Sequence, residues 1–306
     1  MVHGNDTTPA AAFDRLRPRL FGIAYRMLGS VADAEDAVQE AFLRWEQARA
    51  RGDTIAAPEG WLVSVTTRLC IDQLRSARVK REEYVGQWLP EPLVTAPGSN
   101  AEEAVEMAES LSLAFLVLLE RLSPEERAVF LLHEVFGYPY GEIAPVVGKS
   151  EAACRQLAKR ARDRIEVGRP RYHVSDEAAE RLAAEFLRAS VEGDLPALLS
   201  LLTEDVELVA DGGGRATAAP KPVRGADLVA RFLVGVVHLG PAGWTATPAT
   251  VNGGPGLIAR DAEGRPYAVL ALEPSGKRIA AIRVVLNPAK LHGVPDGQSD
   301  DDGTSR

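Results

Sequence analysis

The feature that most constrains the fold of this chain lies at residues 138–165. The pattern there predicts a helix, a tight glycine turn and an arginine-rich second helix. The segment reads YPYGEIAPVVGKSEAACRQLAKRARDRI. Gly148 suits the end of the first helix, and Ser150 suits the N-cap of the second. From Lys149 to Arg164 there are six positive and two negative charges, a net +4 in a chain of net charge -8. The pattern predicts a helix-turn-helix, whose second helix enters the major groove of DNA.

The second helix of this pair is expected to make the DNA contacts. Its N-terminal half supplies candidates for base edges and its next turn supplies candidates for phosphates: Glu151, Arg155 and Gln156 for the bases, Lys159 and Arg160 for the phosphates. A solvated basic face on an ordinary helical hairpin is the alternative for this segment taken alone. Pro145 lies inside the first helix, where it removes a backbone hydrogen bond and is expected to kink or shorten that helix.

Another basic run ends the predicted helix PEGWLVSVTTRLCIDQLRSARVKR. The buried side of that helix is expected to consist of Trp61, Val65 and Leu69. Between Arg68 and Arg81 there are five positive charges and one negative charge. Arg68 and Asp72 are spaced to pair with each other. The remaining charges suit either a phosphate backbone or a solvated helix face.

An acidic amphipathic helix precedes that basic helix, at ADAEDAVQEAFLRW. Its apolar residues recur at steps of three or four and predict one buried face: Val31, Ala34, Val38, Phe42 and Trp45. Asp36, Gln39 and Glu40 then point elsewhere. Residues 82–110 contain seven glutamates and neither lysine nor arginine, which indicates a linker.

A new helical domain is expected from Leu111, with a helix start at Ser123, Pro124 and Glu126. After Gly168 the pattern changes again. Two amphipathic helices, a strand, a third helix and three alternating strands are expected there, at 176–191, 195–202, 205–210, 225–236, 244–251, 266–274 and 278–286. Helices followed by a mostly antiparallel sheet indicate an α+β domain. The polar tail PDGQSDDDGTSR is expected to be disordered.

Composition excludes several protein classes. The two cysteines, Cys70 and Cys154, lack the spacing of a zinc site or of a secreted disulfide framework, so neither a metal nor another cofactor is expected. No run of 18 apolar residues and no signal-peptide pattern occurs, which predicts a cytoplasmic protein without a membrane span. The acidic net charge argues against nucleic-acid binding over the whole surface, while the two basic segments allow it locally.

Taken in order, residues 13–166 resemble a group IV, or extracytoplasmic-function, bacterial RNA polymerase sigma factor. The segment ADAEDAVQEAFLRW resembles the region 2.2 helix, GWLVSVTTRLCIDQLRSARVKR resembles regions 2.3 and 2.4, and residues 123–165 resemble region 4. The resemblance implies two all-α domains, a region 2 helical bundle over 1–82 and a region 4 helix-turn-helix over 111–168. An acidic linker over 83–110 would join them.

Carried over by position, the resemblance implies binding to core RNA polymerase, through its clamp coiled coil and flap, and to promoter DNA, without enzymatic activity. The implied residues are Asp36, Gln39 and Glu40 for the polymerase, Arg75, Arg78 and Arg81 for the -10 element, and Arg155, Gln156, Lys159 and Arg160 for the -35 element. The acidic linker suits the basic cleft of the polymerase.

Residues 173–293 resemble a SnoaL-like domain, an α+β cone in which a curved antiparallel sheet and helices enclose a pocket, with 294–306 as the tail. Three stretches resemble signatures of the sigma factors that carry such an extension: WLPEP at 88–92, DGGGR at 211–215 and NPAKL at 287–291. The resemblance implies regulation in cis, in place of a separate anti-sigma factor. The implied regulatory residues are Trp88, Leu89, Pro90, Glu91, Asp211, Gly212, Gly213, Gly214, Arg215, Asn287 and Lys290.

A physical hypothesis accompanies that resemblance. Trp88, Leu89 and the flanking prolines are expected to form an exposed, pre-ordered epitope that the C-terminal domain clamps at little entropic cost. The three glycines of DGGGR allow positive φ and close approach, and we expect them to contact the sigma core of the same chain. Local packing of Trp88, and a capped final turn at NPAKL, are the simpler alternatives.

Two other functions stay open at this point. In the first, the C-terminal domain acts on a small molecule, with Asp211 as base and with further residues near its pocket: Asp205, Glu207, Tyr267 and His238. In the second, the chain is a one-component regulator that senses a ligand in that pocket and binds promoter DNA without polymerase. The ligand of such a pocket is not identified by the sequence.

Overall fold

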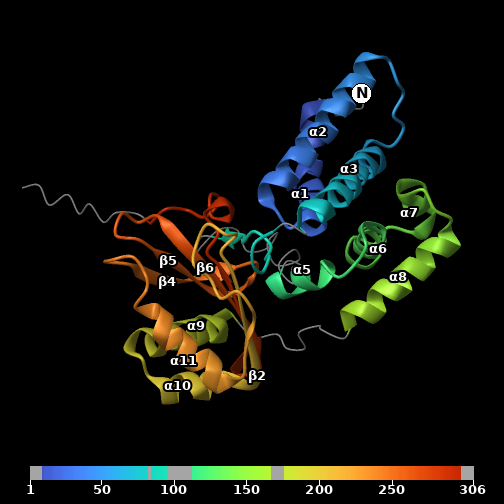
Figure 1. Cartoon of the computed structure of the whole chain (residues 1–306). Helices are drawn as coiled ribbons and strands as arrows, with labels where there is room; N and C mark the ends of the chain where they lie inside the picture. The colour runs from blue at the N-terminus through green and yellow to red at the C-terminus, as the bar shows by residue number, and fades with distance from the viewer. Residues whose placement is uncertain (1–8, 82–83, 96–111, 167–175, 298–306) are drawn as a thin grey trace, which may run out of the picture. The chain divides into compact units, whose positions relative to one another are not determined.

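The structure is a computed structural model that describes residues 9–81, 84–95, 112–166 and 176–297 (Figure 1). The expected tail beyond residue 297 and the expected linker from residue 96 lie outside these residues. The chain divides into two compact units. The helical unit joins residues 1–83 with 118–168, and the C-terminal unit joins 84–117 with 169–306. The first part of the expected linker therefore clusters with the C-terminal part of the chain, while the predicted domain boundaries remain predictions.

The first half of the helical unit is a three-helix bundle of α1 (Pro9–Leu28), α2 (Val31–Ala50) and α3 (Pro58–Arg81). Ser30 caps α2, where its hydroxyl accepts a hydrogen bond from the Asp33 N–H. The predicted inner face of α2 is buried at Ala34, Val38 and Trp45. The acidic residues of this helix consequently lie on its outer side.

The buried face of α3 differs from the predicted face by about one residue. Trp61, Val65 and Leu69 are half-buried. The buried residues of α3 are Leu62, Val63, Thr66, Thr67, Cys70, Ile71 and Leu74. The reason is that α3 packs against both α1 and α2, so its buried surface is wider than the single stripe that a periodic pattern indicates.

The second half of the helical unit is built from short helices. These are α6 (Pro124–Phe130), the π-helical turn η1 (Leu131–Val135), α7 (Tyr140–Val147) and α8 (Glu151–Glu166). The helix before them, α5 (Leu113–Leu119), belongs mostly to the C-terminal unit, which contains residues 84–117. Ser123 and Glu126 form a capping box at the start of α6, as their spacing predicts. Gly148 ends α7 with φ +66°, and Pro145 lies inside α7, which is only 8 residues long.

The C-terminal unit is an α+β domain with a seven-stranded sheet in the order β1-β4-β5-β6-β7-β2-β3. Its helices are α9 (Asp176–Glu192), α10 (Leu195–Leu201), α11 (Ala226–Val237) and the short 3-10 helix η2 (Pro288–Lys290). Its strands are β1 (Val94–Thr95), β2 (Leu202–Asp211), β3 (Val223–Arg224), β4 (Thr245–Val251), β5 (Gly254–Arg260), β6 (Pro266–Ser275) and β7 (Arg278–Val285).

The predicted fold class is confirmed in outline, with one correction to the sheet. Strands β2 and β7 are parallel, whereas every other neighbouring pair is antiparallel. The sheet is therefore mixed and open, not purely antiparallel. Parallel pairing arises because β2 and β7 are far apart in sequence and the intervening chain returns through α11 and the antiparallel strands.

The two faces of this sheet pack against different partners. Figure 1 shows α9, α10 and α11 lying against one face, and the apolar cluster on that face includes Leu208 and Ala210 of β2. The opposite face carries Val209 and a second apolar cluster that contains Leu89 and Leu113. Because side chains alternate along a strand, residue 211 belongs to the second face, against which Leu89, Val94 and Leu113 pack.

Candidate functional site: the carboxylate at the end of β2

Asp211 is the last residue of β2 and is completely buried, with 0% of its surface exposed. Its backbone carbonyl accepts hydrogen bonds from the N–H groups of Leu286 and Asn287 at 2.7 and 3.0 Å. These bonds extend the pairing of β2 with β7 into the chain that follows β7. The backbone thus holds DGGGR and NPAKL, two of the three signature stretches, next to each other.

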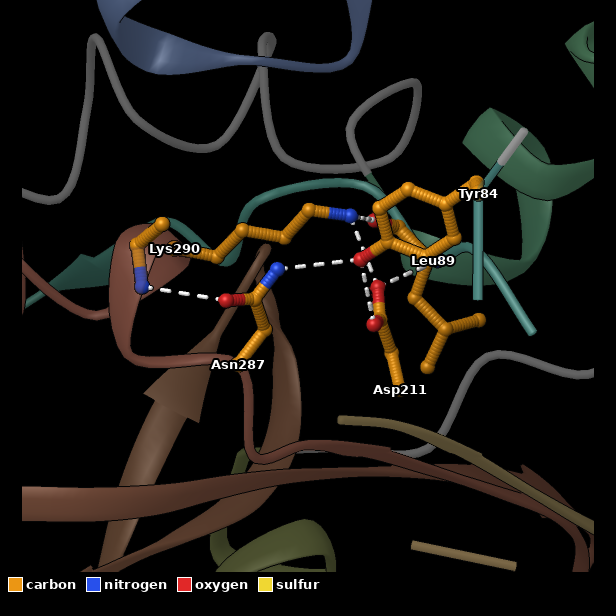
Figure 2. A network of polar contacts seen from close by, with 6 residues as sticks. Tyr84, Leu89, Asp211, Asn287 and Lys290 are labelled. Atoms are coloured by element: carbon orange, nitrogen blue, oxygen red, sulfur yellow. Dashed lines mark hydrogen bonds and ion pairs between the residues drawn. The ribbon is translucent and has the colours of Figure 1, made fainter. Parts of the chain in front are cut away.

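The side chain of Asp211 connects both stretches to the third (Figure 2). Its Oδ1 accepts a hydrogen bond from the Tyr84 hydroxyl at 2.6 Å, and its Oδ2 accepts one from the Leu89 N–H at 2.8 Å. The Lys290 ammonium lies 2.7 Å from the same Oδ2. A buried carboxylate needs such donors, since an unpaired one is strongly unfavourable.

Lys290 binds the linker segment as well as the carboxylate. Its Nζ donates to the carbonyl oxygen of Leu89 and lies 4.3 Å from the centroid of the Trp88 ring and 5.1 Å from that of Tyr84. Cation–π contacts of this kind favour the charged amine. The ammonium is therefore enclosed by one carboxylate, one carbonyl and two aromatic rings.

Asn287 completes the network. Its Oδ1 accepts from the Ala289 N–H at 3.1 Å and so caps the short helix η2. Its Nδ2 donates to the Tyr84 hydroxyl at 3.0 Å. Asn287 thus caps a final turn, as the simpler hypothesis for NPAKL states, and also binds the linker segment. Burial first, and then the Asp211 carboxylate, raise the pKa of the Tyr84 hydroxyl well above its ordinary value.

The glycines of DGGGR are required by close contacts. A Cβ at Gly213 would lie 2.2 Å from Nδ2 of Asn287, and a Cβ at Gly214 would lie 3.1 Å from Cβ of Val85. Both residues have positive φ, +57° and +69°. Arg215 is exposed. The residues that approach these glycines are Tyr84, Val85 and Asn287, all within the C-terminal unit. The expectation that DGGGR contacts the sigma core is therefore corrected: its close contacts among the described residues are with the linker segment and with NPAKL.

The WLPEP stretch is not the exposed epitope that its composition indicates. Leu89 is only 1% exposed, and Pro90 and Glu91 are buried as well, while Trp88 is half-buried. Leu89 packs in the apolar cluster on the sheet face opposite α9, α10 and α11. Further along, Val94 pairs with Val251 of β4, so this segment adds a strand to the sheet edge.

The helical unit carries the residues predicted for polymerase and DNA. On α2, Asp36 and Gln39 are exposed, and Glu40 pairs with Arg44 at 2.7 Å. On α3, Arg75 pairs with Asp72 and, at 2.6 Å, with Glu125 of α6. The side chains of Arg78 and Arg81 lie outside the described residues.

Exposed side chains line the predicted recognition helix α8. Arg155 pairs with Glu151 at 2.7 Å, and Gln156 and Lys159 are exposed. Arg160 is also exposed and lies 3.7 Å from Glu126. These side chains follow the outer side of one helix, while Cys154, Leu157, Ala158 and Ala161 are buried on its inner side.

Comparison with known proteins decides the family. The Sigma-70 region 2 family matches residues 12–79, and the Sigma-70 region 4 family matches residues 112–165. The ECF RNA polymerase sigma factor SigJ of Mycobacterium tuberculosis is 41% identical over 92% of this chain and 93% of its own length. The chain belongs to the extracytoplasmic-function RNA polymerase sigma factors. As an alternative sigma factor it directs transcription initiation.

One further relative and a solved structure of SigJ agree with this assignment along more than nine tenths of the chain. The probable ECF RNA polymerase sigma factor SigI of the same species is 35% identical over 92% of this sigma factor and 94% of its own length. The crystal structure of M. tuberculosis SigJ superposes with a TM-score of 0.75 at 37% identity, covering 94% of this chain and 100% of that chain. The likeness therefore includes the C-terminal domain, and it favours the sigma-factor hypothesis over a one-component regulator.

Sequence reasoning missed the contacts that join regions 2 and 4 of this sigma factor. Arg127 of α6 is buried and donates to the carbonyl oxygens of Leu119 and Met27. Arg68, expected to pair with Asp72, instead donates to the carbonyl oxygens of Pro145 and Val146 at 2.7 and 3.1 Å. The spacing of charges along one helix predicts only ion pairs within that helix. The hydrogen bonds of Arg68 and Arg127 to carbonyl groups far away in the sequence could not be predicted in this way.

The residues proposed for catalysis do not gather around Asp211 in the described part of the sigma factor. Glu207 pairs with Arg224 and Arg283, Asp205 and His238 are exposed, and Tyr267 is half-buried. Among the described residues, no cluster of three or more His, Cys, Asp or Glu is placed to hold a metal ion. No described helix has the length and apolarity needed to cross a membrane.

Proposed function

We propose that this sigma factor is regulated in cis by contact between its linker segment, residues 84–95, and its C-terminal domain. The observation that carries the proposal is the enclosure of Asp211 by Tyr84, Leu89 and Lys290. A carboxylate with 0% exposure, bound to a backbone N–H of the linker, is a specific attachment and not a passing surface contact.

Core polymerase is bound through the outer face of α2. Gln39 and Glu40 follow Asp36 by three and four positions, and all three lie outside the buried face that contains Ala34 and Val38. An acidic, solvated stripe on a rigid helix suits a basic partner surface, for which the clamp coiled coil is the candidate. Region 4 would contact the flap.

Promoter DNA is bound by two basic helices. The end of α3, with Arg75, Arg78 and Arg81, would follow the -10 element. The exposed side of α8 would enter the major groove at the -35 element, with Arg155 and Gln156 toward the bases and Lys159 and Arg160 toward phosphates. The short α7, the αL glycine at 148 and the exposed α8 side chains support this arrangement.

The linker contact regulates because the same segment connects region 2 to region 4. Residues 84–95 would span about 40 Å if extended, at roughly 3.3–3.6 Å per residue. While these residues are attached to the C-terminal domain, they cannot extend between region 2 and region 4. Attachment and release therefore change how far apart the two DNA-binding regions can lie, and no separate anti-sigma factor is needed for this control.

Asp211 acts in this proposal as an anchor and not as a general base. Support comes from its position on the sheet face opposite α9, α10 and α11, and from its three donors, which occupy both carboxylate oxygens. A proton-abstracting base needs access to a substrate. We therefore assign no catalytic reaction to the C-terminal domain.

A reconstituted transcription assay tests the proposal. Promoter output would be compared, with and without core polymerase, for the wild type, Trp88→Ala, Asp211→Ala and a chain truncated after residue 170. We expect core-dependent transcription by the wild type and an altered output, in the same direction, for all three variants. Lys221→Ala is the matched control, because Lys221 is an exposed residue of the same unit. Unchanged output for all three variants would refute regulation in cis.

A further inference from the structure

Three side chains from separate elements of region 4 stack beside the predicted DNA-reading helix. The His133 ring of η1 and the Tyr140 ring at the start of α7 have centroids 4.0 Å apart and an interplanar angle of 29°. The guanidinium carbon of Arg155 on α8 also lies over the Tyr140 ring, 5.5 Å from its centroid. Tyr140 therefore connects an arginine of the recognition helix to the element before the helix-turn-helix.

The fold holds the Tyr140 ring in place. The π-helical turn η1 ends in a tight loop, in which the N–H of Tyr138 donates to the Leu132 carbonyl at 2.8 Å. His133 Nδ1 lies 2.9 Å from the carbonyl oxygen of Tyr138, and because a carbonyl only accepts, Nδ1 carries the proton. This bond fixes the imidazole plane, and the fixed plane supports the Tyr140 ring. Single π-helical turns are frequent at functional sites.

Arg155 is thereby oriented from two sides. Its Nη2 donates to Glu151 Oε2 at 2.7 Å, one turn earlier on α8, while its guanidinium faces the Tyr140 ring. Its side chain nevertheless remains 57% exposed. A free arginine samples many rotamers, and both contacts restrict that sampling before DNA arrives. Reading a guanine edge uses only two of the five N–H donors of a guanidinium.

We propose that Tyr140 is a positioning residue that sets the base preference of Arg155 at the -35 element. The proposal rests on the proposed role of α8 as the reader of that element. Without the aromatic support, Arg155 is free to turn toward a phosphate, which contributes affinity but no sequence information. Loss of Tyr140 should therefore reduce base discrimination at one -35 position more than it reduces binding to DNA in general.

The test uses the full-length sigma factor with core polymerase and a pool of promoters randomised over the -35 element. Each promoter carries its own barcode in the transcribed region, so sequencing the transcripts gives a preference at each -35 position for the wild type, Tyr140→Leu, Tyr140→Phe and Lys159→Ala. We expect Tyr140→Leu to lower the preference at one position by about two- to fivefold, the range of an exposed cation–π contact, with the other positions unchanged. Tyr140→Phe keeps the ring and should match the wild type.

Lys159→Ala separates positioning from general weakening. Removing a phosphate-binding side chain there should lower output from all promoters alike and leave the preferences unchanged. The inference is overturned if Tyr140→Leu leaves every preference intact, lowers all of them together, or gives the same profile as Tyr140→Phe. If the wild type itself shows no core-dependent transcription or no -35 preference, the proposed function of α8 fails first, and the wild-type arm alone reveals that.

Discussion

At the scale of single residues, Asp211 and Lys290 depend on each other. The Asp211 side chain is fully buried and the Lys290 side chain is 13% exposed, so neither charge has enough water to replace its partner. Removing one member of such a pair leaves an uncompensated charge, which costs more than the pair contributes. The linker contact is therefore sensitive to isosteric changes.

Replacing Asp211 with Asn should lower the free energy of unfolding of the C-terminal unit by about 3 kcal/mol, the lower end for a broken buried pair. The lower end applies because Lys290 keeps the Leu89 carbonyl and the Trp88 ring. Urea unfolding of Asp211→Asn, Lys290→Met and the double variant measures this. We expect the double variant to lose less than the sum of the two single variants, and strict additivity would contradict the coupling.

Gly213 offers a separate test of close approach. Gly213→Ala combines positive φ with a Cβ 2.2 Å from Nδ2 of Asn287, whereas Gly276→Ala, in the same unit, has φ +63° and no atom within 4 Å of its Cβ. Gly276→Ala should therefore cost roughly 1–2 kcal/mol from the left-handed backbone alone. Gly213→Ala should cost about 1–3 kcal/mol more. Equal losses in thermal unfolding would mean that the loop does not need close contact.

Tyr84 predicts a pH dependence in the alkaline range. Its pKa is raised in the folded chain by burial first and by Asp211 second, while an unfolded tyrosine has a pKa of about 10. The folded state therefore holds the proton longer than the unfolded state, and stability falls as pH rises above about 10. Tyr84→Phe should flatten this decline between pH 9 and 11. A decline that is equally steep in Tyr84→Phe would assign it to other groups.

At the scale of elements, sequence periodicity predicted the helices and strands whose residue pattern repeats. It missed the elements that form only because another part of the chain packs or pairs with them. The amphipathic stripe of α2 and the capping box of Ser123 were predictable, since each is encoded within a few residues. Strand β5 was missed because GPGLIAR begins with two glycines and a proline, although Asn252 and Gly253 at the turn before it have the positive φ typical of tight hairpins. Strand β1 has two residues, and it forms by antiparallel pairing with β4.

The same contrast holds for the site. The stretches WLPEP, DGGGR and NPAKL were recognised by resemblance, but nothing local in them indicates that Asp211 binds the Leu89 N–H, since the two residues are 122 positions apart. Tyr84 was missed altogether, because one tyrosine in an acidic linker has no periodic partner. Burial of Leu89 was mispredicted because a polar linker is expected to lie in solvent. Leu89 is buried because it packs in the apolar cluster on the sheet face opposite α9, α10 and α11.

Contact between α3 and α6 suggests a prediction at the same scale. Glu125 holds Arg75 at 2.6 Å, although Arg75 is predicted to follow the -10 element. Glu125→Gln should release this arginine and strengthen promoter binding by roughly two- to fivefold, the range of a surface ion pair. Asp72→Asn is the control, because it removes the neighbouring charge on α3 without touching α6. Equal effects of the two substitutions, measured by promoter titration with core polymerase, would show that only local charge matters.

At the scale of the whole molecule, the linker belongs to two structures at once. It is the covalent connection between regions 2 and 4, and its residues 84–95 are also part of the C-terminal unit, where Leu89 joins the apolar cluster and Val94 pairs with the edge of the sheet. If the chain is regulated in cis as proposed, a change that loosens the C-terminal unit changes the connection between regions 2 and 4, while the helices α2 and α8 belong to the other compact unit. This separation of stability from recognition is what regulation in cis requires.

Amide hydrogen exchange on the full chain tests that separation. In the wild type we expect protection at Leu89, whose N–H donates to Asp211, and at Asn252, whose N–H donates to the Leu93 carbonyl at 2.7 Å. Asp211→Asn weakens the charged acceptor, so exchange over residues 84–95 should accelerate at least tenfold, which corresponds to a decrease of about 1.4 kcal/mol in local stability. Exchange in α2 and α8 should not change, because these helices belong to the other compact unit. Faster exchange in all elements together would show that the chain opens as one unit, and the linker would then have no independent release with which to regulate transcription.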